Sequence, residues 1–284
     1  MANISFLGTG LLGSAFAEAA AKRGDSVTVW NRTIEKARPL EALGIRVAAT
    51  PADAVRGAER VHLVLKDDPV VEEVIRQLRP GLAPSAIVID HTTTQPKATA
   101  ERTMRLNAEG VKYLHCPVFI GPVAARQAKG AILASGPRAL FDSVHDALSR
   151  QAERVMYFGE RPDLAAVFKL CGNAFIIGIN AVIADAFAVA KGADVDPAQV
   201  LETIDFFNPS AIIAGRGKNM IAHDFAPTFE LTMARKDVRL MLETAGLQPL
   251  SALQCIARRM DTLIEQGHGA ADLAILGIDS VKEA

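Results

Sequence analysis

Residues 4–16 read ISFLGTGLLGSAF, and this stretch decides the fold of the first half of the chain. Four residues with strand character lead into a glycine-rich turn, and an apolar helical pattern begins at once. A strand, such a turn and a helix in this order are typical of a βαβ unit whose turn binds a pyrophosphate. The glycines would permit the tight turn, a close approach of backbone N–H groups to phosphate, and close packing of helix on strand. The predicted cofactor-binding residues are Gly8, Thr9, Gly10, Leu11, Leu12 and Gly13.

Short β-rich runs alternate with helical patterns from residue 3 to about residue 89, which indicates βαβ units and a parallel sheet of about six to eight strands. After Gly159 the strand signal fades and apolar residues recur at helical spacing. The expected fold class is α/β, with an N-terminal Rossmann-type doubly wound sheet followed by an all-α C-terminal domain. The expected domains are residues 1–162 and 163–284. The later segments predicted as helices are 164–191, 197–206, 230–244, 249–266 and 270–281.

The composition excludes several classes of function. Lys and Arg number 31 against 32 for Asp and Glu, so no global field attracts nucleic acid or an anionic membrane. The three cysteines and six histidines are scattered and never take metal-ligand spacing, so we expect neither a disulfide framework nor a bound metal. No signal-peptide pattern opens the sequence, and the apolar stretch 164–190 is interrupted by polar residues. We therefore expect a soluble cytoplasmic protein in which that stretch is a buried helix.

The residues after the second predicted strand indicate which dinucleotide is bound. An NAD-preferring site usually has a carboxylate there, whereas this chain has Asn31, Arg32 and Thr33. The forked guanidinium of Arg32 suits a 2′-phosphate, and Asn31 and Thr33 add hydrogen bonds. The alternative is a solvated arginine followed by a threonine that caps the next helix. We predict NADP(H) rather than NAD(H).

Lys169 is a cation in an otherwise apolar helical stretch, and Asn173 follows four residues later on the same helical face. Desolvation in such a place lowers the pKa of a lysine, which makes it a usable general acid or base. The alternative is a lysine that reaches solvent beside a structural asparagine. Thr93 follows a predicted strand at the carboxyl edge of the sheet, where its hydroxyl could reach cofactor or substrate. The residues expected beside the cofactor after the fourth strand are Leu65, Lys66 and Asp67.

Five stretches together resemble the β-hydroxyacid dehydrogenase family, which includes 3-hydroxyisobutyrate dehydrogenases and semialdehyde reductases and, more distantly, 6-phosphogluconate dehydrogenases and imine reductases. They are the glycine turn and residues 90–96, 116–131, 169–173 and 236–237. The resemblance implies that Lys169 exchanges a proton with the substrate oxygen and that Asn173 holds the substrate. It implies that Thr93 contacts substrate and cofactor, that Lys236 closes over the nicotinamide, and that the helical domain forms a homodimer or homotetramer.

The chain departs from the family after Pro117-Val118, where relatives acting on hydroxy acids carry Ser-Gly-Gly and grip the substrate carboxylate. This chain has Phe119, Ile120 and Gly121 there. Bulky apolar side chains replace a hydroxyl donor, so the usual carboxylate grip is in doubt. One alternative is a carbonyl compound whose apolar part packs on Phe119. Another is a phosphonate or sulfonate held by Arg126, Arg216, Lys218 or Lys236.

The expected activity is hydride transfer between NADP(H) and a small hydroxy acid or oxo compound, with Lys169 as general acid or base. An imine reductase on the same fold is the first alternative, although relatives of that class usually carry an acidic or tyrosine side chain in place of Lys169. A non-catalytic NADP-binding protein is the second alternative. It would have no reason to keep Lys169, Asn173 and Lys236.

Overall fold

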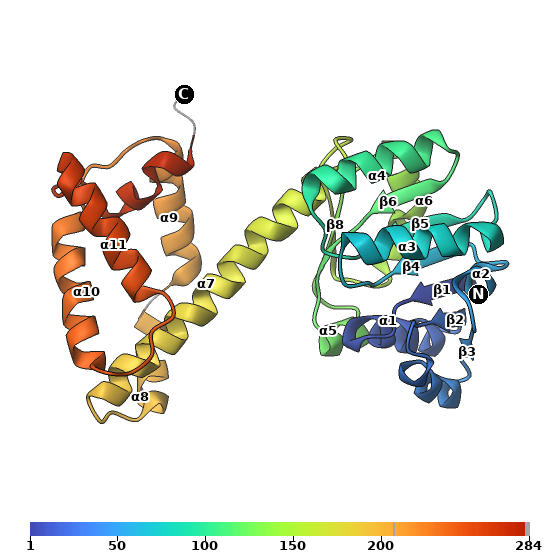
Figure 1. Ribbon diagram of the computed structural model, residues 1–284, viewed down its shortest axis with the longest axis horizontal. Coiled ribbons are helices and arrows are strands. Elements are labelled where there is room, and N and C mark those ends of the chain that lie inside the picture. Colours follow the sequence, from blue (N-terminus) through green and yellow to red (C-terminus); the bar gives the residue numbers. More distant parts are fainter. Residues whose placement is uncertain (207, 282–284) are drawn as a thin grey trace. The chain divides into compact units, whose positions relative to one another are not determined.

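The computed structural model describes residues 1–206 and 208–281. The chain divides into two compact units, Met1–Asn173 and Ala174–Ala284 (Figure 1). The first unit contains both sheets, and the described part of the second unit is helical. This is the α/β fold with a helical C-terminal region that the sequence predicts. The expected boundary at 162/163 falls just before helix α7, Leu164–Gly192, whereas the division between the units falls inside that helix.

The main sheet has six parallel strands in the order β3-β2-β1-β4-β5-β6. The chain moves outward from β1 in one direction and then returns to the other side of β1 with β4. This reversal places the carboxyl ends of β1 and β4 side by side, with Leu7 opposite Leu63. Ligands bind at such a switch point in doubly wound sheets. The strands are β1 Asn3–Leu7, β2 Ser26–Trp30, β3 Arg46–Val47, β4 Arg60–Leu63, β5 Ile87–Asp90 and β6 Lys112–His115.

Both faces of the main sheet are buried, which is why its strands read as continuous apolar runs. Phe6 packs in one apolar cluster with Phe16 of α1, and its neighbour Leu7 packs in another with Leu78 of α3. Residues 35–43, whose pattern is helical, form two 3₁₀ turns because Pro39 has no N–H for a continuous α-helix. The helices of this unit are α1 Leu11–Lys22, α2 Pro51–Val55, α3 Asp68–Leu78, α4 Pro96–Ala108, α5 Pro122–Arg126 and α6 Arg138–Ser149.

The main sheet has six strands, within the expected six to eight, but the last strands predicted in the first unit form a second sheet. β7, Val118–Phe119, pairs antiparallel with β8, Ala131–Ala134, which pairs parallel with β9, Arg154–Tyr157. Pro117 separates β6 from β7 and cannot donate to a strand ladder. Strand β7 is only two residues long, too short for a strand pattern to predict it from the sequence.

The second unit contains α8 Pro197–Glu202, α9 Pro209–Ile221, α10 Leu231–Ala245 and α11 Leu253–Leu263, together with short helical turns. Its core is an apolar cluster that includes Leu231, Val238, Met260 and Leu263. The buried carboxylate of Asp185 on α7 accepts three backbone N–H bonds from residues 251–253 at the beginning of α11. Helix α9 was not predicted, since Gly215 and Gly217 interrupt its apolar pattern.

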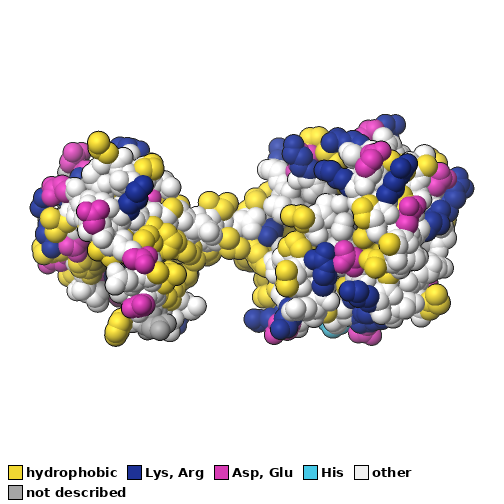
Figure 2. Space-filling view, turned by 90° about the horizontal axis from the view of Figure 1, so that it is seen from below, with side chains coloured by type: hydrophobic (Ala, Val, Ile, Leu, Met, Phe, Trp, Pro, Cys, Tyr) yellow, Lys and Arg dark blue, Asp and Glu magenta, His cyan; other side chains and the backbone are white. Residues whose placement is uncertain are grey.

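Helix α7 is present as predicted, but the expectation that it is buried is wrong for the single chain. Large apolar side chains along it are exposed, among them Phe175, Ile177 and Val182 (Figure 2). Among the described helices α7 alone is long and apolar enough to cross a membrane by length and composition, with a mean hydropathy of 1.8 over its most apolar window. One such helix is weak evidence for a membrane span.

Candidate active site

The glycine turn joins β1 to α1 with no room for side chains at two of its positions. Gly8 has φ +101°, and a Cβ there would lie 2.2 Å from the Val64 carbonyl oxygen. A Cβ on Gly13 would lie 1.9 Å from the Gly8 carbonyl oxygen. The Thr9 N–H donates to the Asn31 side-chain oxygen at 3.0 Å, which ties the turn to the end of β2. Close packing of backbone on backbone therefore fixes this turn, as the sequence predicts.

Gly10 differs from the other two glycines because a Cβ there would meet no protein atom within 4 Å. Gly10 caps α1, and it borders two cavities together with the first residues of that helix. Unpaired N–H groups at a helix N-terminus attract a phosphate. The protein does not need a glycine at this position for its own packing, so the open space fits a bound pyrophosphate.

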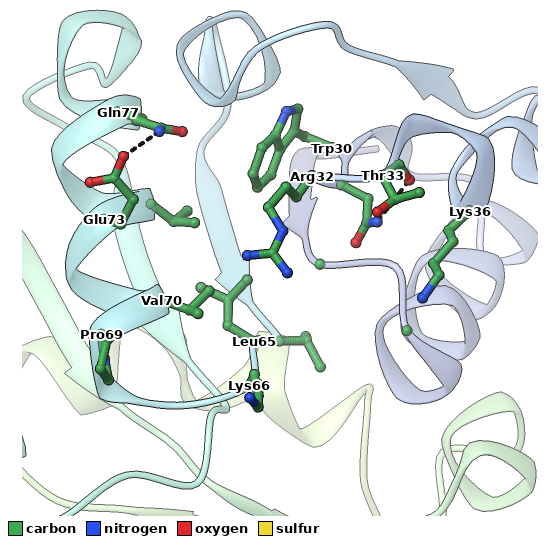
Figure 3. A pocket seen from close by; sticks show the side chains of 15 residues that line it. Trp30, Arg32, Thr33, Lys36, Leu65, Lys66, Pro69, Val70, Glu73 and Gln77 are labelled. Carbon is green, nitrogen blue, oxygen red and sulfur yellow. Dashed lines mark hydrogen bonds between the residues drawn. The ribbon is translucent and has the colours of Figure 1, made fainter.

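The first cavity, of about 540 Å³, lies between the end of β2 and helix α3. Figure 3 shows the Arg32 side chain extending across it between Trp30 and Leu65, with Thr33 and Lys36 on the same side. In the part of the chain that the structure describes, neither Arg32 nor Lys36 has a carboxylate within ion-pair distance. Thr33 makes no side-chain cap to the turn that follows, which leaves its hydroxyl free for a ligand. Two unpaired cations beside a phosphate-sized opening fit a 2′-phosphate.

Lys36 is a candidate cofactor residue that the sequence reasoning missed. It follows Arg32 by four residues, and the 3₁₀ turn Ile34–Lys36 brings its side chain to the border of the same cavity. The segment reads as the start of a surface helix, in which a lone lysine carries no signal. The spacing of two cations after the second strand was the available clue.

A second cavity, of about 360 Å³, contains the predicted chemistry. It is bordered by the N-terminus of α1, by Leu65 and Lys66 after β4, by Thr92 and Thr93 after β5, and by Val118, Ile120 and Lys169. The Leu65 N–H donates to the Thr92 hydroxyl at 3.1 Å, and the Thr92 N–H donates to the buried Asp90 carboxylate at 2.9 Å. These bonds hold the loops after β4 and β5 together, so the exposed Thr93 is presented from a fixed backbone.

Lys169 lies on the first part of α7 with its amine in contact with two side chains. Its Nζ donates to Asn173 Oδ1 at 2.9 Å and lies 4.1 Å from the centroid of the Phe119 ring. Burial lowers the pKa of the Lys169 ammonium. Among the described residues no carboxylate lies within ion-pair distance to oppose that shift. Lys169 therefore has the surroundings of a general acid or base.

Two buried histidines support the floor of the second cavity. His91 Nδ1 lies 2.7 Å from the Cys116 carbonyl oxygen, which can only accept, so this nitrogen carries the proton. His91 Nε2 then accepts from His62 Nδ1 at 2.9 Å. Burial lowers the pKa of His91 to about 4 and that of His62 well below its usual range. Both side chains are neutral, and neither offers a nitrogen to a substrate.

Some predicted residues occupy other places. Asp67 accepts from the Val70 N–H and caps α3, so its side chain is structural. Gly121 caps α5 and does not border the second cavity. Lys236 lies on α10 in the second unit, where its Nζ is 2.7 Å from Asp237 Oδ1, and its predicted role stays a prediction. Within residues 1–206 and 208–281, no group of three His, Cys, Asp or Glu side chains could hold a metal ion.

A switch-point glycine turn with two cavities beside it is typical of a Rossmann-type dinucleotide-binding protein. Residues 3–159 match the family model of the NAD-binding domain of 6-phosphogluconate dehydrogenase. Residues 164–277 match the NAD-binding model of NADP-dependent 3-hydroxyisobutyrate dehydrogenase. The chain belongs to the β-hydroxyacid dehydrogenase family.

Two curated relatives illustrate the range of similar proteins. An uncharacterised oxidoreductase of Shewanella frigidimarina is 29% identical over 253 residues, which cover 86% of each chain. The cytokine-like nuclear factor N-PAC of Homo sapiens is 26% identical over 243 residues, which cover 84% of this chain and 44% of that protein. This chain thus spans less than half of the longer relative.

Solved structures of similar fold include reductases with bound nicotinamide cofactors. An imine reductase from Myxococcus stipitatus in complex with NADP⁺ aligns with a TM-score of 0.87 at 22% identity, covering 96% of this chain and 98% of that one. The Streptomyces aurantiacus imine reductase aligns with a TM-score of 0.87 at 24% identity, covering 99% of this chain and 100% of that one. At these identities the likeness shows the shared fold.

Proposed function

We propose that this protein is an NADP(H)-dependent reductase of a small carbonyl compound, and that it catalyses the reverse oxidation of the corresponding alcohol. The observation that carries the proposal is the position of Lys169. Its amine is half-buried and hydrogen-bonded to Asn173, and it borders the same cavity as Thr93 and the N-terminus of α1. A proton donor thus lies beside the place where the glycine turn would hold the reactive end of a dinucleotide.

The preference for NADP(H) over NAD(H) rests on Arg32, Thr33 and Lys36. These side chains border the cavity next to the glycine turn, and the end of β2 lacks the carboxylate that would pair with a ribose hydroxyl. Arg32 would donate to the 2′-phosphate, with Lys36 as a second positive charge and Thr33 as a hydroxyl donor. When bound, NADPH would supply the hydride.

The residues of the second cavity would manage the proton and the substrate. Lys169 in its ammonium form would donate a proton from Nζ to the carbonyl oxygen during reduction, and as the amine it would accept that proton during oxidation. Asn173 orients the ammonium by accepting from it. The Thr93 hydroxyl is available as a hydrogen-bond donor at the cavity edge.

An imine reductase is the second candidate, and one observation favours it. Val118 and Ile120 give the second cavity an apolar side that suits a neutral imine, and the Phe119 ring packs against the Lys169 amine that borders the same cavity. Lys169 argues for the carbonyl substrate, because an ammonium can give a carbonyl oxygen the proton that the alcohol product keeps. A non-catalytic NADP-binding protein would need no half-buried lysine at this point.

We also infer a homodimer or homotetramer that covers the exposed apolar side chains of α7. Exposed patches of this kind mark interaction surfaces, and self-association through a helical face is the common solution. A soluble cytoplasmic protein without nucleic-acid or membrane partners agrees with the near-balanced charge of the chain. Size-exclusion chromatography with light scattering tests this inference, and a monomer at micromolar concentration would contradict it.

The test of the function is NADPH oxidation against aldehydes, ketones, 2-oxo and 3-oxo acids, oxo-phosphonates and cyclic imines. Lys169→Ala is assayed beside Lys97→Ala, a control on the surface of α4. We expect turnover of a carbonyl compound that collapses only in Lys169→Ala. Turnover of imines alone would support the second candidate, and tight NADPH binding without any turnover would support a non-catalytic protein.

Arg32→Ala, beside the control Arg154→Ala, is expected to weaken NADPH binding about 10- to 100-fold and NADH binding little.

A further inference from the structure

The Phe119 ring occupies a place between Lys169 and Gly172. Phe119 ends strand β7 and pairs with Ala131 of β8. Its carbonyl oxygen lies so close to Gly130 that a Cβ there would come within 2.6 Å of it. The backbone of Phe119 is therefore held on one side, and its ring projects to α7, where Lys169 Nζ lies 4.1 Å from the ring centroid.

Gly172 of α7 provides the space that the ring fills. A Cβ on Gly172 would lie 2.2 Å from Phe119 Cζ and 2.8 Å from Cε1, so the ring could not keep its present position beside a larger residue. Any larger residue at 172 would push the ring away from its present position. Because the backbone of β7 is fixed by its neighbour strand, the ring and the glycine are complementary and depend on each other.

The wall beside Lys169 consequently offers a substrate almost no hydrogen-bond donor. Val118 is buried, Ile120 borders the cavity, and the Phe119 ring covers one side of the amine. A carboxylate, phosphonate or sulfonate against this wall would lose water without gaining a partner, which is costly for an anion. An apolar group has no hydrogen bonds to water to lose, and burying its surface against this wall would be favourable.

Four of the cations that could hold an anionic substrate lie in ion pairs, among them Lys66, which borders the second cavity and lies 3.7 Å from Asp67 Oδ2. Arg126 donates from Nε to Glu18 at 2.6 Å, Arg216 pairs with the buried Asp272, and Lys236 pairs with Asp237. Lys169 itself remains, and its ammonium is already hydrogen-bonded to Asn173 and covered on one side by the Phe119 ring.

We propose that Phe119 and Gly172 form a specificity-determining pair that reserves this site for neutral aldehydes or ketones with an apolar substituent, and excludes substrates with an anionic group. The inference rests on the proposed function for the reaction, but it concerns the polarity of the pocket, which binding measures separately. Phe119 faces the substrate, and Gly172 acts through Phe119.

The test compares methyl 4-oxobutanoate with 4-oxobutanoate, which share the reacting aldehyde and differ in charge. For the wild type we expect kcat/KM to be at least about tenfold higher for the ester. Phe119→Ser, which restores a hydroxyl, should reduce that ratio to about one or invert it, whereas Phe119→Leu, which keeps the wall apolar, should retain the preference for the ester. Gly172→Ala should lower kcat/KM for the ester while the Kd of NADPH stays unchanged.

A binding measurement separates this inference from the proposed function. Butanamide and butanoate, which cannot be reduced, are titrated against the complex of enzyme and NADP⁺ by calorimetry. Tighter binding of the amide that is lost in Phe119→Ser supports the inference even if no carbonyl is turned over. Equal or tighter binding of butanoate to the wild type, or an ester-to-acid ratio that Phe119→Ser leaves unchanged, would overturn it. Absence of turnover with every carbonyl would count against the proposed function alone.

Discussion

The amine of Lys169 and the side-chain oxygen of Asn173 lie 2.9 Å apart on successive turns of α7, and the lysine donates to the asparagine. This hydrogen bond favours the charged ammonium, whereas burial lowers its pKa and favours the neutral amine. The protonation state of Lys169 is therefore set by two opposing effects that can be changed one at a time.

The first prediction concerns the pH dependence of reduction. Because the reaction needs the ammonium, kcat/KM for reduction should fall as pH rises through the lowered pKa of Lys169. Asn173→Ala removes an acceptor of the charged form and should move this fall to lower pH. Lys169→Ala should lose about 10²- to 10⁴-fold in kcat and show no such fall, with the Kd of NADPH unchanged. An unshifted profile in Asn173→Ala would contradict this account of the pair.

Two glycines of one turn should respond in opposite ways to the same substitution. Gly10→Ala adds a Cβ that meets no protein atom, so it should leave stability within about 1 kcal/mol of wild type while weakening NADPH binding at least about tenfold. Gly13→Ala forces a Cβ against the Gly8 carbonyl oxygen and should destabilise the first unit. Trp30 is the single tryptophan and lies in that unit, so its fluorescence during urea unfolding reports the difference. Unchanged NADPH affinity in Gly10→Ala would refute the assigned role of this glycine.

Arg102 and Arg105 provide a matched pair of ion-pair deletions. Both bind Glu72, but the side chain of Arg102 is 0% exposed and also contacts Asp68 and Tyr113, whereas that of Arg105 is 44% exposed. Arg102→Ala leaves the fully buried Asp90 carboxylate, which lies 3.8 Å from Arg102 Nη1, without this cation and should cost about 3–5 kcal/mol in the free energy of unfolding. Arg105→Ala should cost less than about 1 kcal/mol. Urea unfolding followed by Trp30 fluorescence measures both values, and equal losses would show that burial does not decide them.

The pair His62 and His91 predicts a loss of stability in mild acid. Both histidines are neutral when buried, and the pKa of His91 is lowered to about 4, whereas unfolded histidine titrates near 6.5. The unfolded chain therefore binds more protons between these values, and the stability of the first unit should fall as pH decreases from about 6.5 to 4, by about 3 kcal/mol from His91 alone. His62→Leu should reduce this slope, and the exposed His145→Gln serves as the control. A flat profile in the wild type would contradict the neutral pair.

Several features of this protein could be predicted from local sequence, because the residues that determine each of them lie within one short segment. The turn at Gly8–Gly13 lies directly between a strand and a helix, and backbone sterics require glycine at positions 8 and 13. Arg32 follows its strand immediately, and Lys169 and Asn173 face the same way because they are one helical repeat apart. In each case a few neighbouring residues fix the backbone, and the backbone fixes the direction of the side chains.

Other features depend on residues that lie far apart in the chain, and only the tertiary structure decided them. The contact between Phe119 and Gly172 joins a strand to a helix that begins long after it, and neither residue signals the other in sequence. The use of Lys36 beside Arg32, the pairing of His62 with His91 and the separate second sheet depend likewise on how elements pack. Local sequence thus determined the glycine turn and the placing of Lys169 and Asn173 on one face of α7, because short-range sterics and helical periodicity act within one segment. Packing determined the polarity of the site beside Lys169, because a side chain's environment is supplied by whatever the fold places against it.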